Sequence, residues 1–208
     1  MNNEKHGLRI KDERGRVIVE VGPHIMRNNP KFAEQIGIIT AYWAQAEASL
    51  NCLFAILLNT TPEQAYQQLK KHRSAASATK GARTFATENL RGTELNSVLE
   101  ALDQLDEARV QRNRVQHDIW ALKGADVERL FTVHTDLYFK FFIEIMTLSE
   151  KSDNTTIADP ISIAMKFAAK FSDSYTVADL QSIVQKIDMA CRHLLNVMFS
   201  IRLARGDS

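Results

Sequence analysis

Residue types able to act on a phosphodiester lie together in the segment Arg112-Asn113-Arg114-Val115-Gln116-His117. Histidine titrates near neutral pH, so it acts as a general base on a 2′-hydroxyl or as a general acid on a leaving oxygen. Arginine presents a fork of N–H donors that matches a phosphate and stabilises charge on its oxygens. With Asn113 orienting either group, Arg112 and His117 predict RNA cleavage without a metal or cofactor. Attack by the 2′-hydroxyl would leave a 2′,3′-cyclic phosphate and spare DNA.

The spacing of these residues limits how they meet. Asn113 and His117 are four residues apart, so they share one face of a helix. Arg112 and His117 are five residues apart, and in a straight helix they point about 140° from each other. They converge if the arginine side chain reaches round, if the helix is kinked, or if a second copy of the segment faces the first across a dimer.

Arg112 falls on the centre line of an apolar seam formed by Leu105, Ala108, Val115 and Ile119. An arginine in such a seam is costly unless it is paired, at an interface or lining a cleft. Two further explanations stay open from the sequence. Arg112 pairs with an acidic residue of another helix, or the helix ends before Arg112.

Glu47 is the acidic residue that fits such a pair. At about 100° per residue it lies within about 40° of Trp43 and about 20° of Phe54, both on the apolar stripe of its helix. A carboxylate so close to a core face needs a partner. The alternative is that Glu47 sits at the rim of the core and reaches water.

Hydrophobic periodicity predicts the elements that position these residues. A β-hairpin is expected within residues 1–22, with turn residues at Asp12–Gly15. Thr61 with Pro62, and Thr176 with Asp179, are typical helix starts. Five helices are predicted, at 31–58, 62–72, 75–90, 94–122 and 177–203.

Residues 123–175 are harder to interpret. Leu130–Thr135 and Leu137–Ile145 fit a helical period, but their aromatic and β-branched residues favour two short strands, within about 127–146. A loop is expected at 149–160 and an apolar segment at 161–171. The fold class predicted is mainly α: a helical bundle with a small β-hairpin and these short strands.

Basic side chains are candidates for binding RNA. Lys70, Lys71 and Arg73 end the second helix, and Arg109 and Arg114 lie near the end of the fourth. The alternative is that these cations form a solvated face and balance the dipoles of their helices.

Composition excludes several other classes. The 208 residues favour one domain, 1–208, and a formal net charge of +1 argues against a general polyanion binder. Cys52 and Cys191 are far apart, so free thiols in a reducing cytoplasm are expected. The polar start of the chain does not resemble a signal peptide, and no apolar run is long enough for a membrane span.

The other histidines suggest no second site. His6, His24, His72, His134 and His193 lack metal-ligand spacing, so no metal is predicted. His134 lies in an aromatic stretch and is interpreted as structural. Trp43 and Trp120 are interpreted as core residues.

The Arg112-Asn113-x3-His117 segment resembles the signature of the HEPN superfamily, in which an arginine and a following polar residue precede a histidine. The long helix with Glu47 and the second long helix that ends in the motif agree with this resemblance. It covers about 31–122 and the C-terminal helix. Residues 1–22 and 123–175 are an extension and an insertion that it does not explain. Asp118 departs from the small residue expected after the histidine, and its charge opposes phosphate binding.

The resemblance implies an all-helical bundle core and a homodimer that brings two motifs into one cleft. For many members it implies a metal-independent endoribonuclease of toxin–antitoxin or phage-defence type, whose partners are RNA and an antitoxin or other regulatory protein. Arg112 and His117 would then be catalytic and Asn113 would assist them. The alternative is a non-catalytic HEPN-like module for dimerisation, interaction or nucleotide binding.

Overall fold

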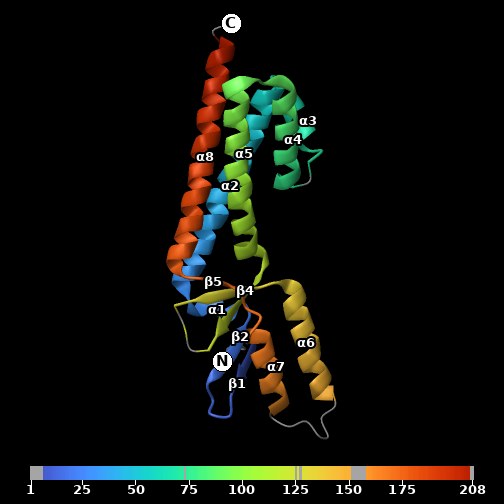
Figure 1. Ribbon diagram of the computed structural model, residues 1–208, viewed down its shortest axis with the longest axis vertical. Coiled ribbons are helices and arrows are strands. Elements are labelled where there is room, and N and C mark those ends of the chain that lie inside the picture. The colour runs from blue at the N-terminus through green and yellow to red at the C-terminus, as the bar shows by residue number, and fades with distance from the viewer. Residues whose placement is uncertain (1–6, 73, 125, 127, 151–157, 207–208) are drawn as a thin grey trace. The chain divides into compact units, whose positions relative to one another are not determined.

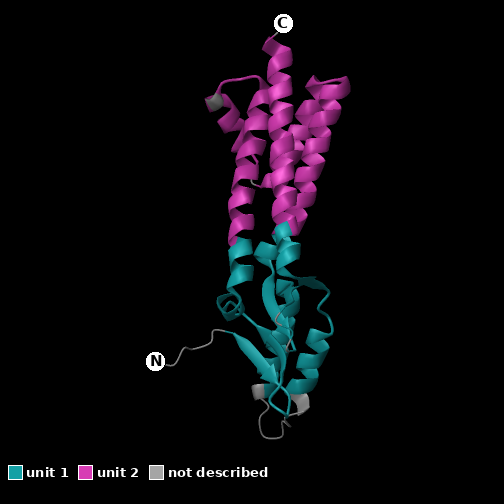
Figure 2. Ribbon diagram, turned by 90° about the vertical axis from the view of Figure 1, so that its left-hand side faces the viewer, with its two compact units in different colours: residues 1–36, 113–181 teal, residues 37–112, 182–208 magenta. Residues whose placement is uncertain are grey.

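The computed structural model describes residues 7–72, 74–124, 126, 128–150 and 158–206. The chain is mainly helical with a small antiparallel sheet (Figure 1). It divides into two compact units, coloured separately in Figure 2. The helical unit comprises 37–112 and 182–208, and the sheet unit comprises 1–36 and 113–181.

The helical unit holds all or part of five helices. They are α2 (Pro30–Leu58), α3 (Pro62–Leu69), α4 (Ala75–Asn89), α5 (Gly92–His117) and α8 (Val177–Gly206). The division between the units falls within α2, α5 and α8. The helices predicted at 31–58, 62–72, 75–90 and 177–203 are confirmed, with ends that differ by a few residues.

Capping residues define several of these helix ends. The Thr61 hydroxyl accepts from the Gln64 amide, with Pro62 in the first turn of α3. The Thr176 and Asp179 side chains each accept from the other's backbone amide, the reciprocal capping box predicted for α8. The first amides of a helix have no partner within the helix, and these capping side chains accept from them. The capping residues therefore set where α3 and α8 begin.

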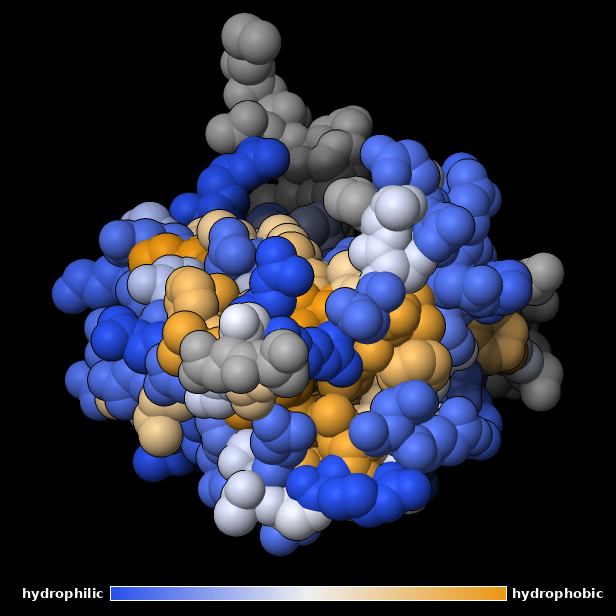
Figure 3. All heavy atoms as spheres, turned by 90° about the horizontal axis from the view of Figure 1, so that it is seen from above, coloured by the Kyte–Doolittle hydropathy of each residue, from blue (hydrophilic) through white to orange (hydrophobic). Residues whose placement is uncertain are grey.

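The core of the helical unit is apolar and lies between its helices. Trp43, one of the predicted core residues, is 2% exposed. Other buried side chains are Ile39, Ala46, Leu50, Leu53, Leu102, Leu105, Ala108, Ile187, Ala190, Leu194 and Ile201. In the view from above, which faces the end of α8, apolar side chains gather in the middle and hydrophilic ones surround them (Figure 3).

The sheet unit is built on five antiparallel strands in chain order. They are β1 (Leu8–Lys11), β2 (Val17–Val21), β3 (Ile119–Lys123), β4 (Leu130–Val133) and β5 (Asp173–Tyr175). The hairpin predicted within 1–22 is confirmed as β1 and β2, apart from residues 1–6, which lie outside the described ranges. Three shorter helices complete this unit: α1 (His24–Asn28), α6 (Thr135–Glu150) and α7 (Ala158–Ala168).

The core of the sheet unit lies between the sheet and the helices α6 and α7. The rings of Phe141 in α6 and Phe167 in α7 stack with centroids 3.9 Å apart. Val19, Val21, Ala121, Val133, Ile163, Ala164 and Ala168 complete the buried cluster. The stacked rings hold α6 against α7. Both helices bury one apolar face in this shared core.

Two predicted elements are wrong. The fourth helix was expected to reach residue 122, but α5 ends at His117 and Ile119–Lys123 form β3 between β2 and β4. Leu137–Ile145 was expected to be a strand, but it lies within α6. Its apolar residues at three- and four-residue spacing bury one helix face, and this packing outweighs the strand preference of their types. The loop expected at 149–160 is wrong at both ends, because residues 149–150 end α6 and Ala158–Pro160 begin α7. Residues 151–157 lie outside the described ranges.

A buried carboxylate ties β1, β2 and α1 together. Glu20 is 5% exposed, and its oxygens accept from Arg9 Nε at 2.6 Å and from Arg9 Nη2 at 2.5 Å. The His24 Nε2 atom lies 2.5 Å from Glu20 Oε1. An added Cβ at Gly7 would come within 2.3 Å of the His24 ring and 2.6 Å of the Val21 carbonyl oxygen, so only glycine fits beside this cluster.

Glu20→Gln should lower the free energy of unfolding by about 3 kcal/mol, because the change breaks a buried hydrogen-bonded ion pair. Burial alone raises the pKa of Glu20, but the hydrogen bonds from Arg9 and His24 outweigh burial and hold the pKa below its ordinary value. The stabilisation is therefore present above the unfolded pKa, about 4.3, and is lost as pH falls through the folded pKa. Urea titrations at pH 7 and pH 3 measure it.

Arg16→Ala is the matched control, because it removes an exposed pair with Asp12 on the same hairpin. It should change stability little. A loss for Glu20→Gln no larger than that of the control would contradict the structural role of the buried cluster.

Candidate functional site

The end of α5 opens onto a cavity of about 350 Å³ within the sheet unit. Asn113, Arg114 and His117 line it from α5, so this part of the predicted site is brought together. The remaining lining comes from the residue between α5 and β3, from β4 and the residue after it, from α6, and from the segment between α7 and β5 with the first residue of β5. These residues are Asp118, Thr132, Val133, His134, Leu137, Lys170, Phe171, Ser172 and Asp173.

The change from helix to strand after His117 creates this cavity. The Asp118 amide makes the final helical bond, 3.2 Å from the Arg114 carbonyl oxygen. Ile119 then pairs with Val133 of β4. The Trp120 indole N–H donates to the Val115 carbonyl at 3.2 Å, which ties the new strand back to the last turn of α5. His117 therefore lies near the end of β4, on the same cavity as His134.

His134 is the second imidazole of this cavity. It directly follows β4 and precedes α6, and its backbone carbonyl accepts from the Leu137 and Tyr138 amides. The ring Nδ1 accepts from the Asp136 amide at 3.4 Å, so the side chain caps the first turn of α6. The ring is 70% exposed. His134 was interpreted as structural; its ring does cap α6, and it also lines the same cavity as His117.

Two cations bring positive charge to the cavity. Arg114 Nη1 lies 2.8 Å from Asp173 Oδ1, and both side chains are about half exposed. This ion pair joins α5 to β5. Lys170 follows α7 and is exposed. The cavity therefore presents an arginine and a lysine beside two imidazoles, a set able to hold a phosphate group.

Asp118 is the acidic residue most affected by this surrounding. Burial raises the pKa of Asp118 above its ordinary value, and the carboxylate of Asp173 acts in the same direction. The charges of His134, Arg114 and His117 oppose the increase without cancelling it.

Arg112, the remaining residue predicted to be catalytic, belongs to the helical unit. Its guanidinium carbon lies 5.4 Å from the centroid of the Trp43 ring on α2. Burial lowers the pKa of Arg112 and the charge of Glu47 raises it, with burial the larger effect. The electrostatic coupling to Glu47 agrees with the predicted partnership. The alternative that the helix ends before Arg112 is wrong, because α5 continues to His117.

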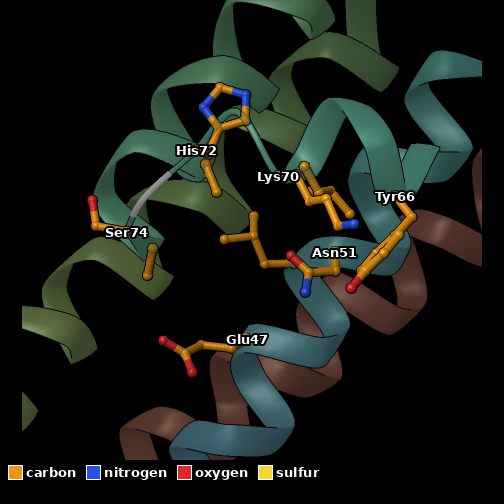
Figure 4. A pocket seen from close by; sticks show the side chains of 10 residues that line it. Glu47, Asn51, Tyr66, Lys70, His72 and Ser74 are labelled. Carbon is orange, nitrogen blue, oxygen red and sulfur yellow. The ribbon is translucent and has the colours of Figure 1, made fainter. Parts of the chain in front are cut away.

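Glu47 lines a second cavity, of about 320 Å³, which lies wholly within the helical unit. Figure 4 shows Glu47 and Asn51 on α2, Tyr66 on α3 and Lys70 at the end of α3. Lys70 Nζ lies 4.6 Å from the centroid of the Tyr66 ring. The His72 ring meets Phe54 edge-on, and an added Cβ at Gly81 would come within 2.6 Å of that ring. Glu47 itself is exposed, as the rim alternative predicted.

Of the other basic candidates, Lys71 and Arg109 line neither cavity. Lys71 donates to the Gln68 side chain at 2.7 Å. Arg109 pairs with Asp106 at 3.1 Å, and Asp106 also pairs with Arg83. Arg73 lies outside the described residues. Their role in binding RNA stays a prediction.

Sequence reasoning missed His134, Lys170 and Asp173 as members of the cavity. Each is far from the motif in the chain, and the antiparallel order of β3, β4 and β5 brings them to it. The only local signal was the sequence His134-Thr135-Asp136, which is typical of a helix start. Had a helix been predicted to begin at Thr135, His134 would have been recognised as the residue that precedes it.

Among the described residues, no group of three or more histidine, cysteine or acidic side chains could hold a metal ion. Over the same residues, no helix is long and apolar enough to cross a membrane. Comparison with protein families, with characterised proteins and with solved structures found no match to this chain.

Asp118→Asn should raise the melting temperature at pH 7. The pKa of Asp118 is raised in the folded state. The stability that Asp118 contributes is therefore fully present below its unfolded pKa, about 3.9, and is lost as pH rises through the folded pKa. Asparagine removes the cost of the ionised form, so the difference from the wild type should shrink as pH falls to 4. Thermal denaturation across this pH range measures it, with the exposed Asp126→Asn as control. A lower melting temperature at pH 7 would contradict the assignment.

Proposed function

We propose that this protein is a metal-independent endoribonuclease that cleaves RNA by attack of the 2′-hydroxyl. The observation that carries the proposal is the cavity at the end of α5, which gathers His117, His134, Asn113, Arg114 and Lys170. Two imidazoles supply a base and an acid, and the two cations complement a phosphate.

The proposed reaction needs one proton removed and one proton donated. One imidazole takes the proton of the 2′-hydroxyl as its oxygen attacks phosphorus. The other donates a proton to the 5′-oxygen as the bond from phosphorus to that oxygen breaks. The products are a 2′,3′-cyclic phosphate and a 5′-hydroxyl, and no electrons are exchanged. DNA lacks the attacking hydroxyl and is not a substrate.

The remaining polar side chains fit supporting roles. Arg114 and Lys170 would stabilise charge on the phosphoryl oxygens, with Asp173 holding Arg114 in place at 2.8 Å. Asn113 lies one helical turn from His117 and would orient the imidazole or the phosphate. The HEPN resemblance supports His117 and Asn113 in these roles, and it implies that Arg112 also acts on the phosphate.

The HEPN resemblance also suggests the biological setting of the proposed nuclease. We propose a cytoplasmic protein of toxin or phage-defence type that acts as a homodimer on RNA. An antitoxin or other regulatory protein would hold such a nuclease inactive until it is needed. The neutral overall balance of charge, +1, fits an enzyme whose RNA contacts are local.

A second candidate function rests on the surroundings of Arg112. Its guanidinium lies over Trp43 and couples to Glu47, which is the arrangement of a packing residue. This favours a non-catalytic helical interaction module in which the arginine holds α5 on α2. In that case the histidines serve only local hydrogen bonds.

His117→Ala and His134→Ala should each reduce cleavage of a mixed RNA pool about 100-fold or more, because each removes one proton-transfer group. Cleavage is measured with EDTA present and with DNA of the same sequences alongside. His193→Gln is the matched control, since His193 lies in the helical unit and bonds the Gln104 side chain. Full activity in either alanine variant would overturn the assignment of that histidine.

Arg112→Met separates a catalytic role of Arg112 from a packing role. If the arginine acts on the phosphate, cleavage should fall about 100-fold while the circular dichroism spectrum stays native. If the arginine only packs on Trp43, cleavage should survive and the melting temperature should fall. The double change with Glu47→Met should then recover stability, because both members of the charge pair become apolar.

A further inference from the structure

One wall of the cavity at the end of α5 has no role in the proposed chemistry. This apolar wall is formed by Val133 at the end of β4, Leu137 in α6 and Phe171 in the segment between α7 and β5. All three residues belong to the sheet unit, as do the other lining residues. Imidazoles and cations are sufficient to move protons and to hold a phosphate. The apolar wall therefore suits another part of the substrate.

The Phe171 ring in this wall is held in place by two other rings. Its centroid lies 4.9 Å from that of Phe167, edge-on, and 5.6 Å from that of Phe131. Phe171 itself is only partly buried. Aromatic side chains are the platforms on which unpaired bases stack in complexes with single-stranded RNA. Because the ring is already fixed, a base that packs on it orders little further.

Asp118 supplies a polar group that the proposed chemistry also leaves unused. It lies between α5 and β3, is partly buried and lines the cavity. Among the described residues, its amide bonds the Arg114 carbonyl, but no hydrogen bond or ion pair engages its carboxylate. Asp173, the other carboxylate of the cavity, is paired with Arg114 at 2.8 Å. An ionised carboxylate only accepts hydrogen bonds, so Asp118 suits a ligand group that carries N–H donors.

The groups suited to a base are chain neighbours of the groups suited to a phosphate. Asp118 directly follows His117, and Phe171 directly follows Lys170. Consecutive Cα atoms lie about 3.8 Å apart, so both kinds of group border one small cavity. Its volume of about 350 Å³ is near the lower end of the range for sites that hold one small ligand, about 300 to 1,000 Å³. One nucleotide fits this size better than a stack of paired bases.

We propose that the cavity binds one unpaired guanine of single-stranded RNA, with the base packed on Phe171 and Leu137 and its Watson–Crick edge donating to Asp118. Guanine has two adjacent N–H donors on this edge, N1–H and the 2-amino group, which match the two oxygens of a carboxylate. Adenine, cytosine and uracil each place an acceptor beside their donor there, and a carboxylate repels that acceptor. The inference rests on the proposed function, because it assumes that RNA occupies this cavity.

Binding of 2′-O-methyl oligonucleotides to the full chain, followed by fluorescence anisotropy, tests the inference without requiring cleavage. A uridine pentamer with a central guanine should bind about tenfold more tightly than one with a central inosine, which lacks only the 2-amino group. Asp118→Asn should reduce this ratio to about twofold or less, because an amide presents one acceptor oxygen in place of two. Asp136→Asn is the matched control, since it removes an exposed carboxylate near His134 that does not line the cavity.

Phe171→Leu tests the stacking platform. In the wild type, a pentamer with a central abasic site should bind about tenfold more weakly than the guanine pentamer. Phe171→Leu keeps an apolar side chain but removes the ring, so this difference should shrink to about threefold or less. Phe139→Leu is the control, because Phe139 is 62% exposed on α6 and lies outside the cavity. Thermal melting confirms that each variant folds, and the Asp118→Asn ratio decides if Phe171→Leu does not.

Three results would overturn the inference. They are equal binding of the guanine and inosine pentamers, a guanine preference that Asp118→Asn retains, and a wild type that binds none of the pentamers. RNA cleavage that is equally fast at guanine and inosine would leave the proposed function standing without this specificity. Guanine-selective binding that depends on Asp118, in a protein that cleaves no RNA, would support the base site and count against the nuclease.

Discussion

The hydrogen bond from the Trp120 indole to the Val115 carbonyl oxygen stabilises the junction between α5 and β3, on which the site depends. At this point the chain leaves α5 and enters β3, with only Asp118 between the two elements. A helix that continued would carry Ile119 and Leu122 along the seam, away from β4. Because the chain turns instead, His117 ends the helix beside the strand that delivers His134. The candidate chemistry therefore follows from one local change of secondary structure that the sheet stabilises.

Three charged side chains are wholly or partly removed from water, Glu20 wholly and Arg112 and Asp118 in part, and their surroundings differ. Glu20 is fully paired, and its hydrogen bonds outweigh the cost of burial. Arg112 is balanced by an aromatic ring and a carboxylate, with burial still the larger effect on its pKa. At Asp118 burial also prevails, within a cavity that holds charges of both signs. The Glu20 cluster, which is buried and hydrogen-bonded on both carboxylate oxygens, has the features of a structural ion pair.

Local signals in the sequence predicted the helices and failed where distant pairing decides the structure. The caps at Thr61 and Thr176 and the long apolar stripes located α2, α3 and α8 to within a few residues. Ile119–Lys123 kept the helical period, and only its pairing with β2 and β4 makes it a strand. In α6 the aromatic residues favoured a strand by type, although their spacing was helical. The motif located half of the cavity, and the strand order supplied the half that no local pattern contains.

The cavity at the end of α5 is proposed to cleave RNA through attack of the 2′-hydroxyl. The most direct measurement is mass spectrometry of the ends produced from an RNA oligonucleotide, compared with the same sequence carrying 2′-O-methyl groups. The account predicts 2′,3′-cyclic phosphate and 5′-hydroxyl ends from the first, and an intact methylated strand. Cleavage of the methylated strand, or products with 5′-phosphate ends, would contradict it.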